Sequence, residues 1–380
     1  MSAVQRSCRL EPPVPRPRLY AGADQPARLS LEIDSIEDRA RIVPVISRDV
    51  LQMPFCALSM LVRSDRAHLP KVFVVAPLSG HFPILLRDLL IGLLPDFEVY
   101  FSDWVNARHV PNRCGPFDLE ANVSYIAEMI EHLGPGLNVI ALCQAGVPAL
   151  VATAHLSEKN ARCAPRSLVL MAAPVDPGSN PTRIVRLIRA KQLPWYKRNV
   201  IRPVLSPYRG KGRLVYPASA QLLGLQTYLG RHLCEGGELF SKMFQDDGCE
   251  PQRFPFADLY SALMDLPAEL FLDIIRHIYK ESSLWNRTLT ARGQLVDFTA
   301  IRSTALMTVE GENDDVAAPG QTRRAHDLCV SIPAAQRRQL VVPRCGHFSL
   351  FHGEVWRAHV LPAVRAFIGK QGPAGAGAPV

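Results

Sequence analysis

The stretch LNVIALCQAG, residues 137–146, decides how this chain is organised. Its first six residues are almost all aliphatic, which predicts a short strand buried on both faces of a sheet. A helix is predicted to follow over 148–155. Cys143 therefore stands where a buried strand turns into a helix.

Further buried strands are predicted at KVFVVAP (71–77), EVYFSDW (98–104) and SLVLMAAP (167–174). Helical segments lie between them at 83–94 and 118–133, and the second has apolar residues at helical spacing. Strands that alternate with helices in this way predict βαβ units and a parallel sheet.

The alternation stops after the fourth strand and returns more than a hundred residues later. Residues 181–295 contain no buried-strand run and are predicted to be mainly helical. Strands return at 303–311 and 339–344, and a last helix is predicted at 354–368. A sheet that is interrupted and then resumed predicts one α/β fold with an inserted helical cap over the carboxyl ends of its strands, where ligands bind in such sheets.

The sheet is thus predicted to form from two parts, 66–180 and 296–370, with the cap between them. An N-terminal extension, 1–65, precedes them, and it begins with a Pro-rich arm that ends at about residue 28. Residues 371–380 are predicted to be a disordered tail. We expect neither end to carry the chemistry.

The composition excludes several classes of protein. With 48% apolar residues, the 380-residue chain can bury a sizeable core, so it is not a disordered chain. Its 43 Lys+Arg and 35 Asp+Glu give a net charge of +8, but the basic residues are scattered and form no nucleic-acid-binding arm. No H-E-x-x-H, Walker or G-x-G-x-x-G motif occurs, so we expect no metal and no cofactor.

The cysteines and the apolar runs indicate where in the cell the protein is expected. The nine Cys form no CxxC pair, which fits reduced thiols in a cytosol. The N-terminus lacks the apolar core of a signal peptide, and the longest apolar stretch, 89–94, is too short to span a membrane. We expect a soluble, cytoplasmic protein.

Three predicted strand ends carry reactive side chains in the chain order nucleophile, acid, histidine. That order is the one used by α/β-hydrolases. Cys143 is the candidate nucleophile, and His347, which follows a glycine, is the candidate base. For the acid, Asp314 and Asp315 both follow the strand at 303–311, and spacing alone does not separate them.

A nucleophile at such a turn is strained and crowds its neighbours, so the residues two before and two after it must be small. Ala141 and Ala145 meet that requirement. Oxyanion donors are expected from the backbone N–H of Leu78 or Ser79, after the first strand, and from that of Gln144.

One more polar residue lies beside the expected oxyanion donors. His81 follows the first strand within APLSGH, residues 76–81. We expect it to have a structural or supporting role.

Several segments together make the chain resemble the intracellular polyhydroxyalkanoate (polyhydroxybutyrate) depolymerases. They include VFVVAPLSGHF (72–82), VIALCQAGVPAL (139–150), TVEGENDDVAAPGQT (308–322) and CGHFSLFHGEVW (345–356). The matching segments span roughly 45–370. The family's usual Cys-Gln-Pro is here Cys-Gln-Ala-Gly.

The resemblance implies an ester hydrolase with Cys143 as nucleophile, Asp314 as acid and His347 as base. It implies attack on poly(3-hydroxyalkanoate), a 3-hydroxyacyl thioester on the enzyme, and release of 3-hydroxyacids or oligomers. The expected partner is the polymer or the surface of its cytoplasmic granules. Because a thioester is readily attacked by another thiol, coenzyme A is a second possible acyl acceptor.

Two other functions stay open at this point. A polyhydroxyalkanoate synthase-like acyltransferase uses the same three residues in the reverse reaction, although synthases are usually longer and carry a full G-x-C-x-G. A non-catalytic granule-associated protein would keep the fold. Such a protein has no reason to retain Cys, Asp and His together at strand ends.

Overall fold

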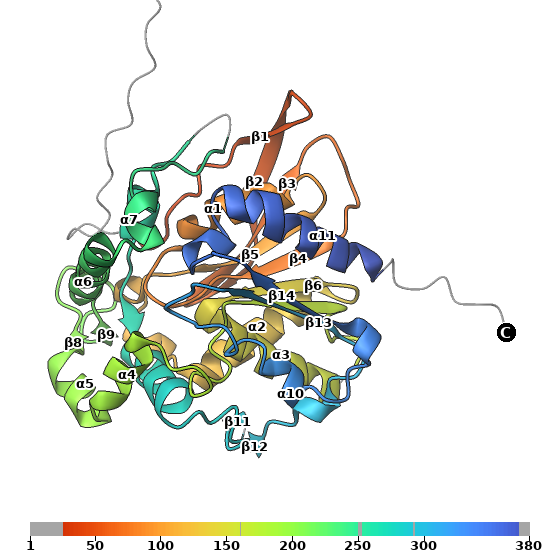
Figure 1. Cartoon of the computed structure of the whole chain (residues 1–380). Helices are drawn as coiled ribbons and strands as arrows, with labels where there is room; N and C mark the ends of the chain where they lie inside the picture. Colours follow the sequence, from red (N-terminus) through yellow and green to blue (C-terminus); the bar gives the residue numbers. More distant parts are fainter. Residues whose placement is uncertain (1–25, 160, 250–252, 292, 372–380) are drawn as a thin grey trace, which may run out of the picture.

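A computed structural model describes residues 26–159, 161–249, 253–291 and 293–371 (Figure 1). Most of the predicted Pro-rich arm and the predicted tail from 372 onward lie outside these residues. The described part is built on a nine-stranded sheet in the order β1-β2-β3-β5-β4-β6-β7-β13-β14. The strands are β1 (Ser35–Asp38), β2 (Arg41–Met53), β3 (Cys56–Arg63), β4 (Lys71–Val75), β5 (Glu98–Trp104), β6 (Asn138–Leu142), β7 (Ser167–Met171), β13 (Ala305–Gly311) and β14 (Arg337–Val342).

The six strands from β5 to β14 in this order are parallel to one another. Every residue of β6, β7 and β13 is buried, as expected for parallel strands that are covered on both faces. The strands β1, β2 and β3 extend the sheet with antiparallel pairing. The sequence analysis did not predict these three strands. In β2 the residues are mostly exposed or half-buried, and Pro44 lies inside the strand, so neither periodicity nor composition indicated one.

Helices cover both faces of the sheet (Figure 1). On one face α1 (Arg87–Leu93) packs against the C-terminal helix α11 (Leu361–Lys370), and Arg365 donates to the Gly92 carbonyl at 2.7 Å. On the other face α2 (Leu119–Leu133) packs against α3 (Gly146–Lys159). This mostly parallel sheet, with a strand-to-helix turn at the end of β6, is the α/β-hydrolase fold that the sequence predicted.

The segment between β7 and β13 forms a separate group of short elements on one side of the sheet (Figure 1). Its longer helices are α4 (Arg183–Ala190), α5 (Leu193–Asn199), α6 (Ala218–Glu235), α7 (Glu238–Lys242), α8 (Phe256–Ser261), α9 (Ala268–Asp273) and a π-helix (Ile274–Lys280). Its short strands are β8 (Arg202–Pro203), β9 (Leu214–Tyr216), β10 (Leu266–Pro267), β11 (Thr290–Ala291) and β12 (Gln294–Leu295). We call this segment the cap. Among the described residues, no helix combines the length and apolar character that crossing a membrane requires.

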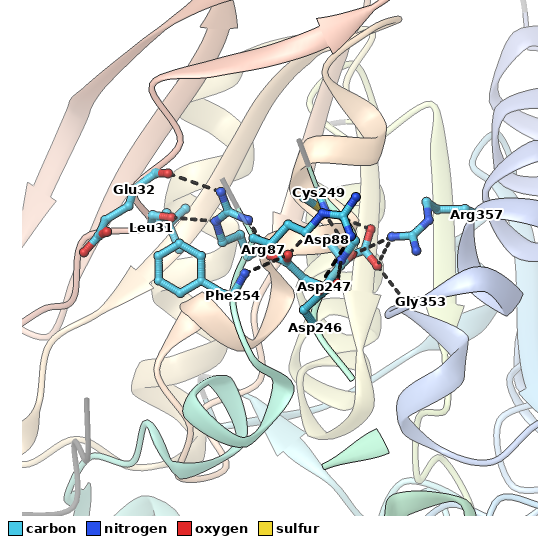
Figure 2. A network of polar contacts seen from close by, with 12 residues as sticks. Leu31, Glu32, Arg87, Asp88, Asp246, Asp247, Cys249, Phe254, Gly353 and Arg357 are labelled. Atoms are coloured by element: carbon cyan, nitrogen blue, oxygen red, sulfur yellow. Dashed lines mark hydrogen bonds and ion pairs between the residues drawn. The ribbon is translucent and has the colours of Figure 1, made fainter. Parts of the chain in front are cut away.

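Buried charges tie the cap to the helices of the core (Figure 2). Arg87 of α1 forms an ion pair with Asp247 of the cap, and both side chains are almost completely buried. The neighbouring Asp88 accepts hydrogen bonds from the Gly353 N–H at 2.6 Å and from Arg357 Nη1 at 2.8 Å. A buried charge is tolerated only when it is paired and hydrogen-bonded, so this network fixes the cap segment in one position.

Arg87→Met removes the cation while keeping much of the side-chain length. We expect the free energy of unfolding to fall by about 3–5 kcal/mol, because Asp247 stays buried without its partner. Urea unfolding followed by fluorescence measures the change. Adding Asp247→Asn is expected to restore much of the loss, since the amide oxygen can still accept from the Cys249 and Phe254 N–H groups. A double variant no more stable than Arg87→Met would contradict this account.

Candidate active site

Cys143 lies at the sharpest turn of the sheet edge. Strand β6 ends at Leu142, Cys143 begins a single 3-10 turn, and α3 starts at Gly146. The φ angle of Cys143 is +49°. A non-glycine residue in this left-handed region is strained, and such strain is typical of a nucleophile elbow.

The elbow is tightly packed at Gly146, although the departure from Cys-Gln-Pro at Ala145 and Gly146 was expected to loosen it slightly. Ala141 and Ala145 are buried and small, as predicted. A Cβ atom added to Gly146, however, would lie 2.3 Å from the Cβ of Ala173, which follows β7. Glycine at the first residue of α3 is what lets the helix approach the neighbouring strand end. The sequence signal was the glycine three residues after the cysteine, one place beyond the usual motif.

His347 and Asp314 meet at the ends of β14 and β13. Asp314 Oδ2 lies 2.8 Å from His347 Nδ1, and both side chains are buried. The other oxygen of Asp314 accepts from the N–H groups of Val316 and Ala317, each at 2.8 Å. These bonds fix the carboxylate and leave Nε2 of the imidazole for another partner.

The geometry also distinguishes the two aspartates that spacing left open. Asp315 turns toward helix α6 of the cap, where it pairs with Arg231 and accepts a hydrogen bond from the Tyr228 hydroxyl. His232 Nε2 lies 3.2 Å from the same carboxylate. Asp314 faces His347, whereas Asp315 joins the cap to the loop after β13.

The charge state of His347 follows from its neighbours. Burial opposes protonation, but the charges of Asp314 and the Cys143 side chain, and hydrogen bonds to both, outweigh it and hold the pKa of His347 well above its ordinary value. The imidazole therefore links Cys143 on one side to Asp314 on the other. Such a relay of thiol, imidazole and carboxylate suits nucleophilic acyl transfer.

The cap holds the loop that carries His347. Glu238 of α7 accepts from the Gly346 N–H at 2.9 Å and from the Ser349 N–H at 3.3 Å. Lys242, one turn later, donates to the His352 carbonyl at 3.1 Å. Sequence reasoning missed Glu238 because it lies more than a hundred residues before the loop, in a helix of only five residues.

The expected oxyanion donors lie at the neighbouring strand ends. Ser79 and Gln144 line the same cavity as Cys143. Leu78 is buried and, together with Gln144, borders a small separate void. The structure thus brings the loop after β4 and the start of α3 to the two sides of Cys143.

A cavity of about 430 Å³ extends from Cys143 and His347 up to the cap. Most of its walls are apolar. They include Leu85 and Leu86 of the core, Ile184, Leu187 and Ile188 of α4, Leu225 of α6, and Phe348 and Phe351 of the histidine loop. A larger, more polar cavity of about 630 Å³ lies between α4 and the loop after β7, and it contains none of the predicted site residues.

Comparison with known proteins gives one family match. Residues 172–372, more than half of the chain, match the family model described as PHB de-polymerase C-terminus. Among curated proteins, none matches this sequence.

Several solved structures are similar at a distance. A membrane phospholipase A, described as a novel bacterial virulence factor, is 12% identical, with 87% of each chain covered and a TM-score of 0.49. A bromoperoxidase from Bacillus anthracis is 10% identical, with 86% of this chain and 99% of that chain covered and a TM-score of 0.49. A putative lipase from Acinetobacter baumannii AYE is 12% identical over 86% and 93% of the two chains, with a TM-score of 0.45. Likenesses this distant carry no argument about the substrate.

Gly146→Ala is expected to disturb the elbow. The added methyl group has no room beside Ala173, so we expect a loss of about 1–3 kcal/mol in the free energy of unfolding, and lower esterase activity as the turn shifts. Gly230→Ala in α6 is the matched control, because a Cβ there meets nothing within 4 Å. It is expected to leave stability unchanged or to raise it by up to about 1 kcal/mol. Equal stability and activity of the two variants would show that a methyl group fits at Gly146.

Glu238→Ala tests whether the cap positions the loop that carries His347. We expect kcat for a soluble p-nitrophenyl ester to fall by about 100-fold with little change in KM, because the imidazole is displaced while the cavity remains. Glu238→Gln keeps one acceptor oxygen, so its kcat should lie between those of wild type and Glu238→Ala. Glu131→Ala in α2 is the control, since Glu131 is exposed and its ion pair with Lys159 is loose at 3.7 Å. Full activity in Glu238→Ala would mean that the loop holds its shape without the cap.

Proposed function

The chain belongs to the PHB depolymerase family, and from this premise we propose that it hydrolyses ester bonds of poly(3-hydroxyalkanoate), with polyhydroxybutyrate as the expected polymer. The observation that carries the proposal is the linked set Cys143, His347 and Asp314 at the floor of an apolar cavity. An aliphatic polyester presents alternating apolar groups and esters, which fits a mostly apolar cavity with one reactive end.

In the first half of the reaction, Cys143 acts as the nucleophile. His347 takes the thiol proton, and the raised pKa of its imidazole favours the resulting imidazolium. The sulfur adds to the ester carbonyl, the carbon–oxygen bond to the leaving 3-hydroxyl breaks, and His347 returns the proton to that oxygen. Asp314 keeps the imidazole oriented throughout.

The tetrahedral intermediate carries a negative oxygen that needs donors. We assign these to the backbone N–H of Gln144, in the turn just before α3, and to that of Leu78 or Ser79. Preorganised backbone donors stabilise the developing charge without rearrangement. The placement of both segments beside Cys143 supports the assignment.

In the second half, water attacks the 3-hydroxyacyl thioester with His347 as base, and a 3-hydroxyacid or short oligomer leaves. Coenzyme A is the alternative acceptor, and its thiol would give a free 3-hydroxyacyl thioester instead.

A second cavity supports water as the acceptor. It has a volume of about 260 Å³ and also reaches His347. About half of its lining is polar, with Arg231, His232, Glu235, Asn313 and Asp315 among the lining residues. Water therefore has a polar region beside the base that is distinct from the apolar cavity.

This polar region favours hydrolysis over the synthase-like alternative, because polymer growth requires that water be kept from the thioester. A non-catalytic granule protein is disfavoured by the linked set of Cys143, His347 and Asp314, which such a protein has no reason to retain.

We further propose that the enzyme works in the cytoplasm at the surface of polymer granules. The cap exposes apolar side chains, including Leu187 of α4, which also lines the cavity, Leu223 of α6 and Trp195 of α5. Such residues suit contact with an amorphous polyester surface. The resemblance to intracellular depolymerases is the other support for this location.

The decisive experiment incubates native amorphous granules with wild type and with Cys143→Ala, and measures released 3-hydroxyacid with and without coenzyme A. We expect release by wild type and a loss of at least about a thousandfold in the variant. Release of the acid alone in the presence of coenzyme A identifies water as the acceptor. Equal release by both proteins would remove Cys143 from the mechanism, and polymer growth from a 3-hydroxyacyl thioester would favour the synthase.

A further inference from the structure

Among the buried polar atoms that lack a hydrogen-bond partner within the described residues, two belong to neighbouring side chains at the wall of the apolar cavity. They are His81 Nε2 and the hydroxyl oxygen of Tyr260. Both residues line the cavity that contains Cys143 and His347. A buried polar group without a partner costs about 1–3 kcal/mol, so two of them in one cavity call for an explanation.

The role of each atom follows from its surroundings. The His81 ring hydrogen-bonds the backbone carbonyl of Tyr260. Since Nε2 has no partner, the donor is Nδ1, and in the neutral ring Nε2 is then an acceptor. Burial lowers the pKa of His81 to about 4, so the ring is neutral at pH 7. Burial raises the pKa of the Tyr260 hydroxyl, which therefore keeps its proton and can donate.

The two side chains are held firmly beside the reactive groups. Their rings lie 5.5 Å apart. The backbone around His81 is paired with the chain that follows Tyr260, through Phe82 N–H to the Ala262 carbonyl at 2.8 Å and Met264 N–H to the Gly80 carbonyl at 2.7 Å. The Tyr260 ring also packs at 5.5 Å against that of Phe348, the residue after His347. This is a preformed pair of one acceptor and one donor.

We propose, on the basis of the polyester hydrolysis proposed above, that His81 Nε2 and the Tyr260 hydroxyl bind the free 3-hydroxyl at the end of the polymer chain. A hydroxyl can donate to His81 and accept from Tyr260 at the same time. An ester carbonyl only accepts and would leave His81 unpaired. The pair therefore distinguishes the hydroxyl end of a chain from its interior, and His81 is a binding residue instead of the structural one that the sequence suggested.

The proposal determines which part of the substrate stays bound. With the terminal hydroxyl on His81 and Tyr260, the hydroxyl-end unit forms the acyl group on Cys143. The remainder of the chain leaves with the newly freed 3-hydroxyl. That new end can enter the same site in the next cycle, so the enzyme shortens chains from their hydroxyl ends.

Two trimers of 3-hydroxybutyrate methyl ester test the proposal, one with a free hydroxyl end and one with that hydroxyl converted to a methyl ether. For wild type, we expect kcat/KM to be higher for the free trimer by about 100-fold or more, because the ether cannot donate to His81. His81→Leu should lower the rate for the free trimer and bring the ratio close to one. Tyr260→Phe should lower the rates for both trimers and keep most of the ratio, because the ether oxygen also accepts from the Tyr260 hydroxyl. His81→Gln, which retains an acceptor oxygen, should keep more of the ratio than His81→Leu.

A control and a stability measurement separate binding from folding. Tyr216→Phe removes a hydroxyl from another tyrosine of the same cavity and should leave the ratio unchanged. Tyr260→Phe should unfold at the same temperature as wild type or higher, since it removes an unpaired buried group. Equal rates of wild type on both trimers, an unchanged ratio in His81→Leu, or an unchanged rate for the free trimer in Tyr260→Phe would overturn this proposal alone. No hydrolysis of either trimer or of granules by folded wild type would overturn the proposed function with it.

Discussion

The backbone of Cys143 is the constraint on which the site depends. A φ of +49° turns the chain from β6 into α3 within one residue and leaves the thiol at the edge of the sheet. The turn persists only because α3 can press against the end of β7, where Gly146 meets Ala173 without a side chain between them. The packing of two core elements thus maintains a strained conformation that the local sequence alone would relax.

The site is completed by the cap as well as by the sheet. Asp314 and His347 come from the two outermost parallel strands, whose ends lie side by side. The loop that carries His347 is held on its other side by Glu238 and Lys242 of the cap. A change in cap position would therefore alter the base as well as the cavity. The buried network of Arg87, Asp247 and Asp88 counters such a change by anchoring the following cap segment to α1 (Figure 2).

The parallel strands were predictable because each is a short run of buried aliphatic residues between helices. The antiparallel strands were not. Strand β2 is half-exposed and contains a proline and several charges, so it resembles a loop in sequence, whereas β3 is a buried apolar run that the sequence prediction missed. Residues at strand ends were found by chain order, but Asp314 and Asp315 were adjacent in sequence and opposite in direction. The structure separates them, because Asp314 contacts His347 whereas Asp315 binds the cap. Glu238 and Gly146 act through contacts between distant segments, and no local pattern indicates such contacts.

His81 shows how a residue with a weak sequence signal acquires a role from its surroundings. A buried histidine is ordinarily satisfied at both nitrogens, and a histidine after a strand has no special meaning by itself. Here one nitrogen is engaged by the Tyr260 carbonyl and the other is left unpaired at a cavity wall. Other buried polar atoms of the described residues also lack a partner, both ring nitrogens of His352 among them, so what distinguishes His81 is its place at the cavity wall beside Tyr260. An unpaired acceptor beside an unpaired donor, next to the proposed nucleophile and base, is what a site for a hydroxyl group requires.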